Sequence, residues 1–548
     1  MSALAPWLRH YDPGVRSTLG PYPNRTLLDY LETHARERTD GPAILYKGST
    51  LSWRDLDQQS DAFAAALLSI GVQAGDRVGL LLPNCPQFLV AEFGAWKIGA
   101  IVAPLNPIYT EHELEGPLRE NGVDTVVTLT RFYERVKRVQ PKAGVKRVIA
   151  TNIKHYFPFG LRLLFTLFRE KKDGDRIHLA AGDYDYGQLM RAHAGQAPPA
   201  LKLTADDNAV LLLSGGTTGT PKGVLGKHGA YTITGYQVQE WTKTVLGIAD
   251  SRIMLPLPLF HVYGHVGVQG LAIVTANPLI LVPNPRDLND LLTSINKTKP
   301  TFFNGVPTLY VGMLNHPLVQ QGKVDFKSIK ICFCGAAALM AETRTRFEQL
   351  TGGRIVEGYS LTEAMMALVI NPVDGPNKIG SVGMPLPDVM VRIYDADEGV
   401  RIMPPKEVGE ICFAGNQIMV RDLPNGQISV SRFDPDRPEQ RREVPPQVDA
   451  VVRAVVDLGG TYPDVVQLLQ EAREGGALPS RLAINALPDT GRTYQRPDAD
   501  AAVATDEEES APEPSFRVAS PLPSLFAAPK SGNKSAKDDF DFAGDSAQ

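Results

Sequence analysis

Short apolar runs alternate with helix-forming segments through most of the first 360 residues, and this alternation limits the fold more than any other feature. The apolar runs include RVGLLL (77–82), AIVAPL (100–105) and VDTVVTL (123–129), and segments 86–99 and 111–121 between them have helical character. Continuous apolar runs are typical of strands buried on both faces, and strands separated by helices pair in parallel. We therefore predict an α/β fold, with a parallel sheet covered by helices on both faces.

The same alternation resumes after residue 207, with strand-like runs at 208–214, 329–335 and 354–360. Near the N-terminus, residues 43–53 predict a hairpin that turns at Lys47-Gly48, followed by a helix from about Trp53 to Gly71. From about Gly380 the pattern changes to short strands with turns, which predicts a small antiparallel unit. A chain of 548 residues exceeds the size of one core, so several domains are expected.

The character of the chain changes again after Val420. Residues 421–446 are polar and rich in proline and arginine, so we expect a linker there. Residues 447–487 predict a small unit of two helices, ended by glycine pairs at 459–460 and 475–476. Residues 488–548 are acidic and of low complexity, which predicts disorder. The expected domains are 24–379, 380–420, the linker 421–446, the helical unit 447–487 and the tail 488–548.

Charge and cysteine usage exclude several classes of protein. The net charge of −5 gives no basic field for nucleic acid. Cys332 and Cys334, two of four scattered cysteines, fall on one face of an expected strand, where buried core thiols are favoured over a metal site. The N-terminus has no secretory h-region and no run reaches about 18 apolar residues, so we expect a cytoplasmic protein.

The stretch SGGTTGTPKG (214–223) stands directly behind the apolar run 209–213. Glycines let backbone N–H groups converge on phosphate oxygens, while hydroxyls and one lysine add donors and charge. The spacing fits neither a Walker A loop nor G-x-G-x-x-G. A flexible surface turn is the alternative, but the composition favours a triphosphate loop. Its predicted phosphate-binding residues are Ser214, Gly215, Gly216, Thr217, Thr218, Gly219, Thr220 and Lys222.

This loop resembles the phosphate loop of the AMP-forming adenylating enzymes, and further motifs follow in the family's order. They are PLFHVYG (258–264), NGVPTLY (304–310), CGAAAL (334–339), EGYSLTEA (357–364), GSVGMPLP (380–387) and GEICFAGNQIMV (409–420). The resemblance covers about residues 24–420 and leans toward the long-chain fatty acid–CoA ligases. It implies an acyl-CoA-synthetase-like large domain of stacked βα subdomains, ending in a truncated β subdomain.

The resemblance also implies residue roles. Lys222, Thr362, Glu363 and His261 would be catalytic: Thr362 contacts the α-phosphate, Glu363 holds Mg²⁺ and His261 lines the acyl entrance. Tyr359 would stack on adenine. The remaining implied nucleotide-binding residues are Gly335, Ala336, Ala337, Glu357, Gly358 and Ser360. The substrates would be a fatty acid, ATP and CoA.

Two of these motifs have simpler interpretations. Ser360 and Glu363 have the spacing of a capping box at a helix start, which is compatible with a phosphate at the same helix end. His261 and His265 are four residues apart, as in a zinc pair, but Val262 stands where H-E-x-x-H requires glutamate, so metal binding is disfavoured. A core histidine is the other interpretation of His261.

Residues 156–172 form an apolar, aromatic stretch with a basic end. It is too short to span a bilayer but suits an interfacial helix that meets lipid-borne substrate, at the inner face of the membrane. A buried core helix is the alternative.

After residue 420 the sequence departs from the family pattern. The last tryptophan is Trp241, the tripeptide Thr-Gly-Asp does not occur, and no lysine lies between Lys406 and Lys530. The ribose-binding aspartate, the hinge and the small domain with its catalytic lysine are therefore not recognisable. Residues 448–484 instead resemble the C-terminal end of the flagellar P-ring protein, as in a chimera made by gene fusion, frameshift or assembly error.

The predicted function is an ATP-dependent long-chain fatty acid–CoA ligase by ancestry, impaired because the small catalytic domain is replaced. Two other functions remain open: a non-catalytic nucleotide- or acyl-binding remnant, and a structural flagellar-type fusion protein. Acyl chain length and oligomeric state are not predicted.

Overall fold

The computed structural model describes residues 6–214, 222–366, 369–394, 403–414, 418–422, 427–434, 437–458, 465 and 468–469. The chain divides into two compact units, a large one that includes Pro6–Asp388 and a small one that begins at Val389. Each unit has its own sheets and core, and each is described by itself below.

Among the described residues of the large unit, one sheet has seven strands in the order β7-β6-β5-β3-β4-β8-β9. All neighbouring pairs are parallel except β8 and β9. Strands β4 and β5 are buried at every position, as expected for parallel strands covered on both faces. The strands are β3 (Arg77–Leu81), β4 (Ile101–Pro104), β5 (Thr125–Leu129), β6 (Arg147–Thr151), β7 (Tyr184–Asp185), β8 (Asn208–Ser214) and β9 (Lys222–Lys227).

The second sheet of this unit has nine strands in the order β16-β15-β14-β13-β12-β10-β11-β1-β2. Its central strands are parallel, and antiparallel strands close both edges. The strands are β1 (Pro42–Tyr46), β2 (Ser49–Ser52), β10 (Ile253–Leu255), β11 (Leu279–Leu281), β12 (Phe302–Gly305), β13 (Ile331–Cys334), β14 (Arg354–Tyr359), β15 (Val369–Ile370) and β16 (Met384–Pro385).

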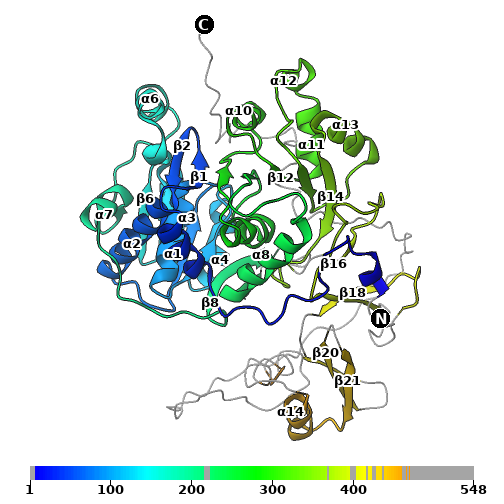
Figure 1. Cartoon of the computed structure of the whole chain (residues 1–548). Coiled ribbons are helices and arrows are strands. Elements are labelled where there is room, and N and C mark those ends of the chain that lie inside the picture. Colours follow the sequence, from blue (N-terminus) through cyan, green and yellow to red (C-terminus); the bar gives the residue numbers. More distant parts are fainter. Residues whose placement is uncertain are drawn as a thin grey trace, which may run out of the picture. The chain divides into compact units, whose positions relative to one another are not determined.

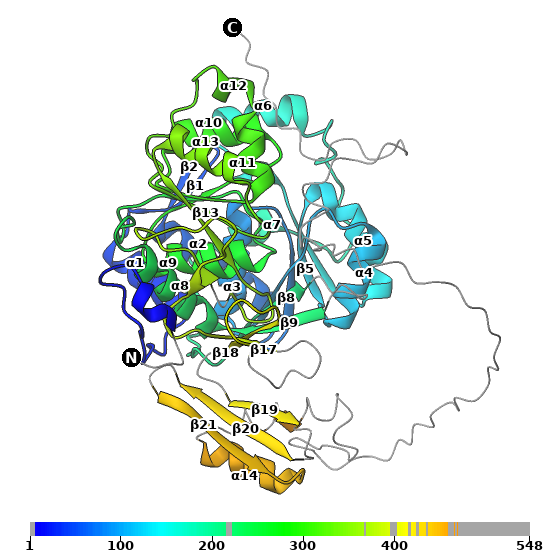
Figure 2. The same ribbon diagram turned by 90° about the vertical axis from the view of Figure 1, so that its right-hand side faces the viewer.

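Helices pack on both sheets, as Figures 1 and 2 show. Helix α3 is buried on nearly its whole circumference, because one side packs on β3 and β4 and Glu92 on the helix contacts the segment after β10. Besides the segment 153–169, which is described below, the helices of the large unit include α1 (Leu27–Glu37), α2 (Trp53–Ser69), α3 (Pro86–Lys97), α4 (Glu111–Glu120), α5 (Tyr133–Ala143), α7 (Tyr186–Ala192), α8 (His228–Thr242), the π-helix η5 (Tyr263–Val268), α9 (Gln269–Val274), α10 (Leu288–Thr298), α11 (Pro307–Leu314), α12 (Pro317–Gln320) and α13 (Ala341–Thr351).

The predicted N-terminal hairpin and helix are confirmed. Strands β1 and β2 pair around Lys47 and Gly48, which both have positive φ, and Ser52 caps α2 in a capping box with Asp55. The helix ends before Gly71, whose φ is +83°.

The apolar stretch 156–172 does not form a core helix. It forms a 3₁₀ turn, η3 (Ile153–Tyr156), followed by α6 (Phe159–Leu164) and the π-helix η4 (Phe165–Arg169). Most of its large apolar side chains are exposed, and Phe165 is buried.

The small unit corrects the prediction of a linker at 421–446. Strands β19 (Ile418–Asp422), β20 (Ile428–Asp434) and β21 (Arg437–Val444) form an antiparallel sheet there. Val430 on β20 is buried with Val451 and Val455 of helix α14 (Val448–Asp457) in one core. The alternation of Ile428 and Val430 with serines is the strand signal, and the polar, proline-rich composition obscured it.

Strands β17 (Met390–Tyr394) and β18 (Glu410–Ala414) form the antiparallel pair expected after Gly380. Helix α14 confirms the first predicted helix of the 447–487 unit. Residues 471–487 and the predicted disordered tail 488–548 lie outside the described residues.

Candidate active site

The predicted site residues all follow the carboxyl ends of parallel strands in the large unit. Ser214 ends β8, His261 follows β10, the 335–337 loop follows β13, and Tyr359 ends β14. Ligands in open α/β sheets bind outside the carboxyl ends of the strands, where the loops converge. The fold therefore brings the motifs, which are scattered over 150 residues, to one edge of each sheet.

The two ends of the glycine-rich loop are adjacent. Ser214 pairs with Lys222 as the last pair of the β8–β9 ladder, with Ser214 buried and Lys222 exposed. The predicted phosphate-binding residues 215–220 lie outside the described residues. At Gly223, a Cβ atom would come within 2.0 Å of Oδ1 of Asn121, so a side chain at this position would displace the amide of Asn121.

The 335–337 loop is held against β14 by a buried ion pair. One carboxylate oxygen of Glu357 accepts a hydrogen bond from the backbone of Leu339 at 2.9 Å, and the other pairs with the guanidinium of Arg344. Glu357 and Arg344 are both buried. Both oxygens of Glu357 are thus used within the protein, so this residue positions the loop. Ala336 has a φ of +67°, a strained conformation that the loop imposes.

Residues 360–366 do not form the helix that a capping box at Ser360 would require. The backbone N–H of Met365 donates to Thr362 at 3.0 Å, and residues 362–366 form a turn. The reason is topological: Tyr359 pairs with Val369 in the antiparallel β14–β15 ladder, so the chain must reverse direction within nine residues. Glu363 is exposed on this turn, while Tyr359, Ser360 and Thr362 are half-buried.

Two methionines on this turn join parts of the site that are distant in sequence. The side chain of Met365 fills the space where a Cβ of Gly226 on β9 would lie, within 2.4 Å. The side chain of Met366 occupies the corresponding space at Gly267 on η5, within 2.7 Å. The turn that carries Thr362 and Glu363 therefore contacts both the strand after the glycine-rich loop and the helix after His261.

The segment that carries His261 is held by a residue that the sequence analysis missed. Asn84, buried just after β3, donates to the carbonyl oxygens of Leu255 and Leu257 at 3.0 and 2.7 Å. Its Oδ1 accepts from the backbone of Leu259 at 2.9 Å. A lone polar residue two positions after the apolar run 77–82 was the available signal.

His261 is linked to the 335–337 loop through its neighbour Tyr263. Burial lowers the pKa of His261 to about 4, so its imidazole is neutral near pH 7. Its Nδ1 accepts a hydrogen bond from the backbone N–H of Tyr263 at 3.3 Å, which places the ring proton on Nε2. The ring of Tyr263 in turn lies 3.1 Å from the place of a Cβ at Gly335.

His265 does not pair with His261 in a metal site. Nε2 of His265 lies 2.8 Å from the carboxylate of Glu92, its Nδ1 contacts the carbonyl oxygen of Leu259, and both residues are fully buried. Cys332 and Cys334 are buried free thiols whose pKa is raised by burial. Within the described part of the chain, no three His, Cys, Asp or Glu residues are grouped as a metal site.

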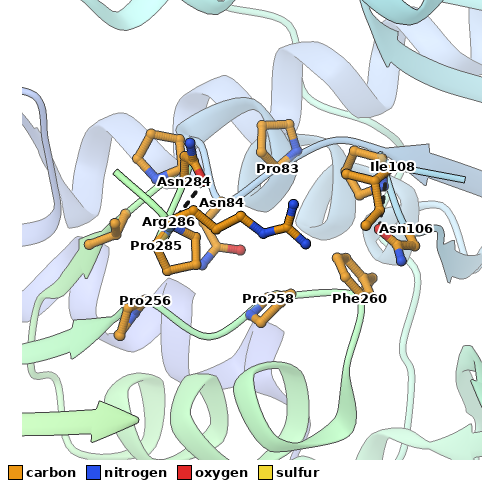
Figure 3. Close-up of a pocket in the computed structure, with 13 residues that line it drawn as sticks. Pro83, Asn84, Asn106, Ile108, Pro256, Pro258, Phe260, Asn284, Pro285 and Arg286 are labelled. Carbon is orange, nitrogen blue, oxygen red and sulfur yellow. Dashed lines mark hydrogen bonds between the residues drawn. The ribbon is translucent and has the colours of Figure 1, made fainter. Parts of the chain in front are cut away.

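A pocket of about 60 Å³ opens where the edges of the two sheets meet. Figure 3 shows the guanidinium of Arg286 extending into it, between prolines from both sheets. Burial lowers the pKa of Arg286, which nevertheless stays cationic near pH 7. The lining residues follow β3, β4, β10 and β11: Pro83, Asn84, Asn106, Pro107, Ile108, Pro256, Pro258, Phe260, Val282, Pro283, Asn284, Pro285 and Arg286.

Known proteins share this sequence and fold. Residues 31–421 match the family described as AMP-binding enzyme. A long-chain-fatty-acid–CoA ligase of Bacillus subtilis is 36% identical over 427 residues, which cover 76% of this chain and 74% of that protein. Its counterpart in Escherichia coli is 31% identical, covering 76% and 73%.

Among solved structures, a long-chain-fatty-acid-CoA ligase from Archaeoglobus fulgidus superposes with a TM-score of 0.62 at 21% identity, covering 80% of this chain and 87% of that one. An anthranilate CoA ligase in complex with anthranoyl-AMP gives the same TM-score at 22% identity, covering 72% of this chain and 70% of that one. These likenesses confirm the predicted fold class. The chain belongs to the AMP-binding enzyme family, among relatives that are long-chain-fatty-acid–CoA ligases.

Proposed function

We propose that the large unit binds ATP and a long-chain fatty acid and joins them as an acyl-adenylate. One observation carries this proposal: the turn with Thr362 and Glu363 contacts β9, whose first residue Lys222 closes the glycine-rich loop. Met365 of this turn packs at Gly226 of β9, so the turn with Thr362 and Glu363 and the strand that begins at Lys222 are neighbours. Relatives named long-chain-fatty-acid–CoA ligases support the choice of acid.

In this reaction a carboxylate oxygen of the fatty acid attacks the α-phosphorus of ATP. A new P–O bond forms, and the bond from the α-phosphorus to the bridging oxygen of the β-phosphate breaks, releasing pyrophosphate. Lys222 and the backbone N–H groups of the loop would offset charge on the phosphates, and Thr362 would contact the α-phosphate. Tyr359 would stack on adenine, and neutral His261 would border the acyl chain without adding charge.

Mg²⁺ fits this arrangement. Magnesium is commonly held by one or two carboxylates together with substrate phosphates and water, and Glu363 is an exposed carboxylate on the turn that contacts β9. When bound, the ion would screen the triphosphate from the attacking carboxylate.

Transfer of the acyl group to CoA would be strongly impaired. The sequence after Val420 has no recognisable ribose aspartate, hinge or catalytic lysine, and the match to the AMP-binding enzyme family covers residues 31–421. The same departure favours a second candidate function, a nucleotide- and acyl-binding protein that turns over slowly or not at all. Pyrophosphate release distinguishes the two.

Titration calorimetry with ATP and Mg²⁺ tests the site itself. We expect the affinity for ATP to be about 10- to 100-fold lower than that of a complete site. The reason is that no aspartate is recognisable that would accept hydrogen bonds from the ribose hydroxyls. Lys222→Ala and Glu363→Gln should each weaken it further. The matched controls are Lys227→Ala on the same strand and Glu342→Gln on α13, both exposed. Binding that is unchanged in the Lys222 and Glu363 variants would refute the assignment.

A further inference from the structure

The segment after β6 exposes a row of large apolar side chains. Phe159, Leu163 and Leu167 recur every four residues on α6 and η4, as do Leu164 and Phe168, so each set lies along one side of the helix. All five are exposed, from 48% to 83%. We call these five residues the 159–168 patch. Contiguous apolar surface of this kind marks an interaction site.

The base of this segment is anchored, so the exposure does not come from a loose chain end. Phe165 is 3% exposed and packs edge-to-face on Phe157, with ring centroids 5.6 Å apart. Oγ of Ser49 donates to the carbonyl oxygen of Tyr156 at 2.7 Å. The patch therefore stands on a fixed support, and Figures 1 and 2 show α6 at the periphery of the large unit.

Acidic and basic residues around the patch differ in their exposure and pairing. The acidic residues pair with basic partners: Glu170 with Lys154 at 2.6 Å, and Asp175 with Arg131 at 2.5 Å. Asp173 pairs with Arg169 at 3.1 Å. The exposed charged residues of 159–172 are all basic: Arg162, Lys171 and Lys172. The outer surface of this segment is thus apolar and positive.

The patch lies at the same sheet edges as the candidate site. Pro158, just before α6, lies 3.6 Å from the place of a Cβ at Gly48, in the turn after β1. Strand β1 runs parallel to β11, so that turn and the pocket-lining residues 282–286 both follow carboxyl ends of this sheet. A surface bound to the patch would therefore lie on the same side of the large unit as the pocket-lining residues 282–286.

We propose that the 159–168 patch docks on the surface of an anionic lipid bilayer. The apolar side chains would enter the boundary between head groups and acyl chains, and Arg162, Lys171 and Lys172 would contact anionic head groups. The contact is interfacial, because none of the helices described in the structure is both long and apolar enough to cross a membrane. The paired acidic side chains and the exposed basic ones leave a positive surface that is complementary to anionic head groups. The proposal goes beyond the proposed function and does not depend on it.

Vesicle co-sedimentation of the full-length chain tests the apolar contact. We expect binding to vesicles of phosphatidylglycerol and phosphatidylcholine, and about 10-fold or greater loss of binding in the triple variant Phe159→Ser, Leu167→Ser, Phe168→Ser. The matched control is Ile248→Ser, Met340→Ser, Ile379→Ser. The target residues are 83%, 65% and 69% exposed and the control residues 60%, 70% and 65%, so neither set should disturb folding. Equal loss in both triple variants, or none in either, would overturn the proposal.

A second pair of variants tests the contribution of the basic residues to vesicle binding. Each basic residue near an anionic surface contributes about 1 kcal/mol, so Lys171→Gln with Lys172→Gln should weaken binding to anionic vesicles about 25-fold and leave pure phosphatidylcholine unaffected. Lys323→Gln with Lys330→Gln, an exposed pair elsewhere, should change neither. Sedimentation velocity tests whether a second copy of this chain binds the patch instead of lipid. If the native chain is a dimer that does not bind vesicles, and the patch variant is a monomer, then the proposal is wrong and the patch is a dimer interface.

Discussion

At the scale of single residues, one buried imidazole should contribute measurably to the loss of stability of the large unit in acid. His228 starts α8, is 1% exposed, and packs edge-to-face on Trp96 with ring centroids 5.1 Å apart. Burial lowers its pKa to about 4. The unfolded chain takes up a proton near pH 6.5 while the folded chain resists it. The free energy of unfolding should therefore fall as the pH drops from 6.5 toward 4, by about 3 kcal/mol at most from this group.

Urea unfolding between pH 7 and pH 4.5 checks this expectation. His228→Phe should flatten the dependence of unfolding free energy on pH by up to one proton in this window. Other histidines with lowered pKa, His34, His155 and His261, keep acting in the same direction in both proteins. His178→Phe, at an exposed site, is the control and should leave the slope unchanged. Identical slopes in the two variants would contradict the argument.

The pair of Arg344 and Glu357 gives a second residue-scale prediction. Removing one partner of a buried pair leaves an uncompensated charge, which costs about 3–5 kcal/mol. Arg344→Met and Glu357→Gln should each destabilise the large unit by a large part of this amount, and the double variant should recover most of the loss. Chemical unfolding of the three variants completes the double-mutant cycle. Additive losses would mean that the pair does not hold the 335–339 loop to β14.

At the scale of elements, the sequence predicts those strands and helices whose type follows from the local spacing of apolar residues. The apolar runs 77–82, 100–105 and 123–129 contain β3, β4 and β5, because strands that are apolar on both faces are stable only inside a sheet covered on both sides. The site could be assembled in part, since the carboxyl ends of such strands share an edge. The polar Asn84 after the run 77–82 could have been singled out, but its partners at 255–259, and the contacts of Met365 with Gly226, join residues far apart in the chain and could not be predicted.

One predicted element is wrong and one open interpretation does not hold. The capping-box interpretation of 360–363 does not hold, because the chain turns back from β14 to β15 and residues 362–366 form a turn. The linker at 421–446 was inferred from composition, although alternation at 428–431 indicated a strand. At 428–431 the alternation of apolar and polar residues predicts the strand correctly, although the proline and arginine content of 421–446 indicates a linker.

The small unit yields a prediction at the same scale. Val430 is fully buried against α14, so Val430→Ala should cost that unit about 2 kcal/mol by removing two buried methyl groups and leaving a cavity. Hydrogen exchange of the full-length chain should then show faster exchange in 428–458 and none of this effect in 77–129. Val408→Ala, at a side chain 92% exposed, is the control. Unchanged exchange in 428–458 would mean that the shared core does not stabilise β20 and α14.

At the scale of the whole molecule, the match to the AMP-binding enzyme family covers residues 31–421, and the central question is which steps of the ligase reaction this part of the chain can perform. Residues 409–420 carry the family's motif, and the strands and helix that follow form a core of their own. The resemblance of 448–484 to the flagellar P-ring protein stays a prediction, with α14 as the one full helix of it in the described residues. Our account is that adenylation can survive in the large unit while thioester formation cannot.

One assay tests this account most directly: the purified chain with palmitate, ATP, Mg²⁺ and CoA, following pyrophosphate and acyl-CoA separately. We expect slow pyrophosphate release, because an active site without the family's catalytic lysine would react about 10²- to 10³-fold more slowly. We expect no acyl-CoA, since without the family's small domain the CoA thiol would not be positioned for attack. Lys222→Ala should abolish the pyrophosphate signal, and Lys227→Ala should not. Acyl-CoA that accumulates at ordinary ligase rates, and vanishes in the Lys222 variant, would contradict the account.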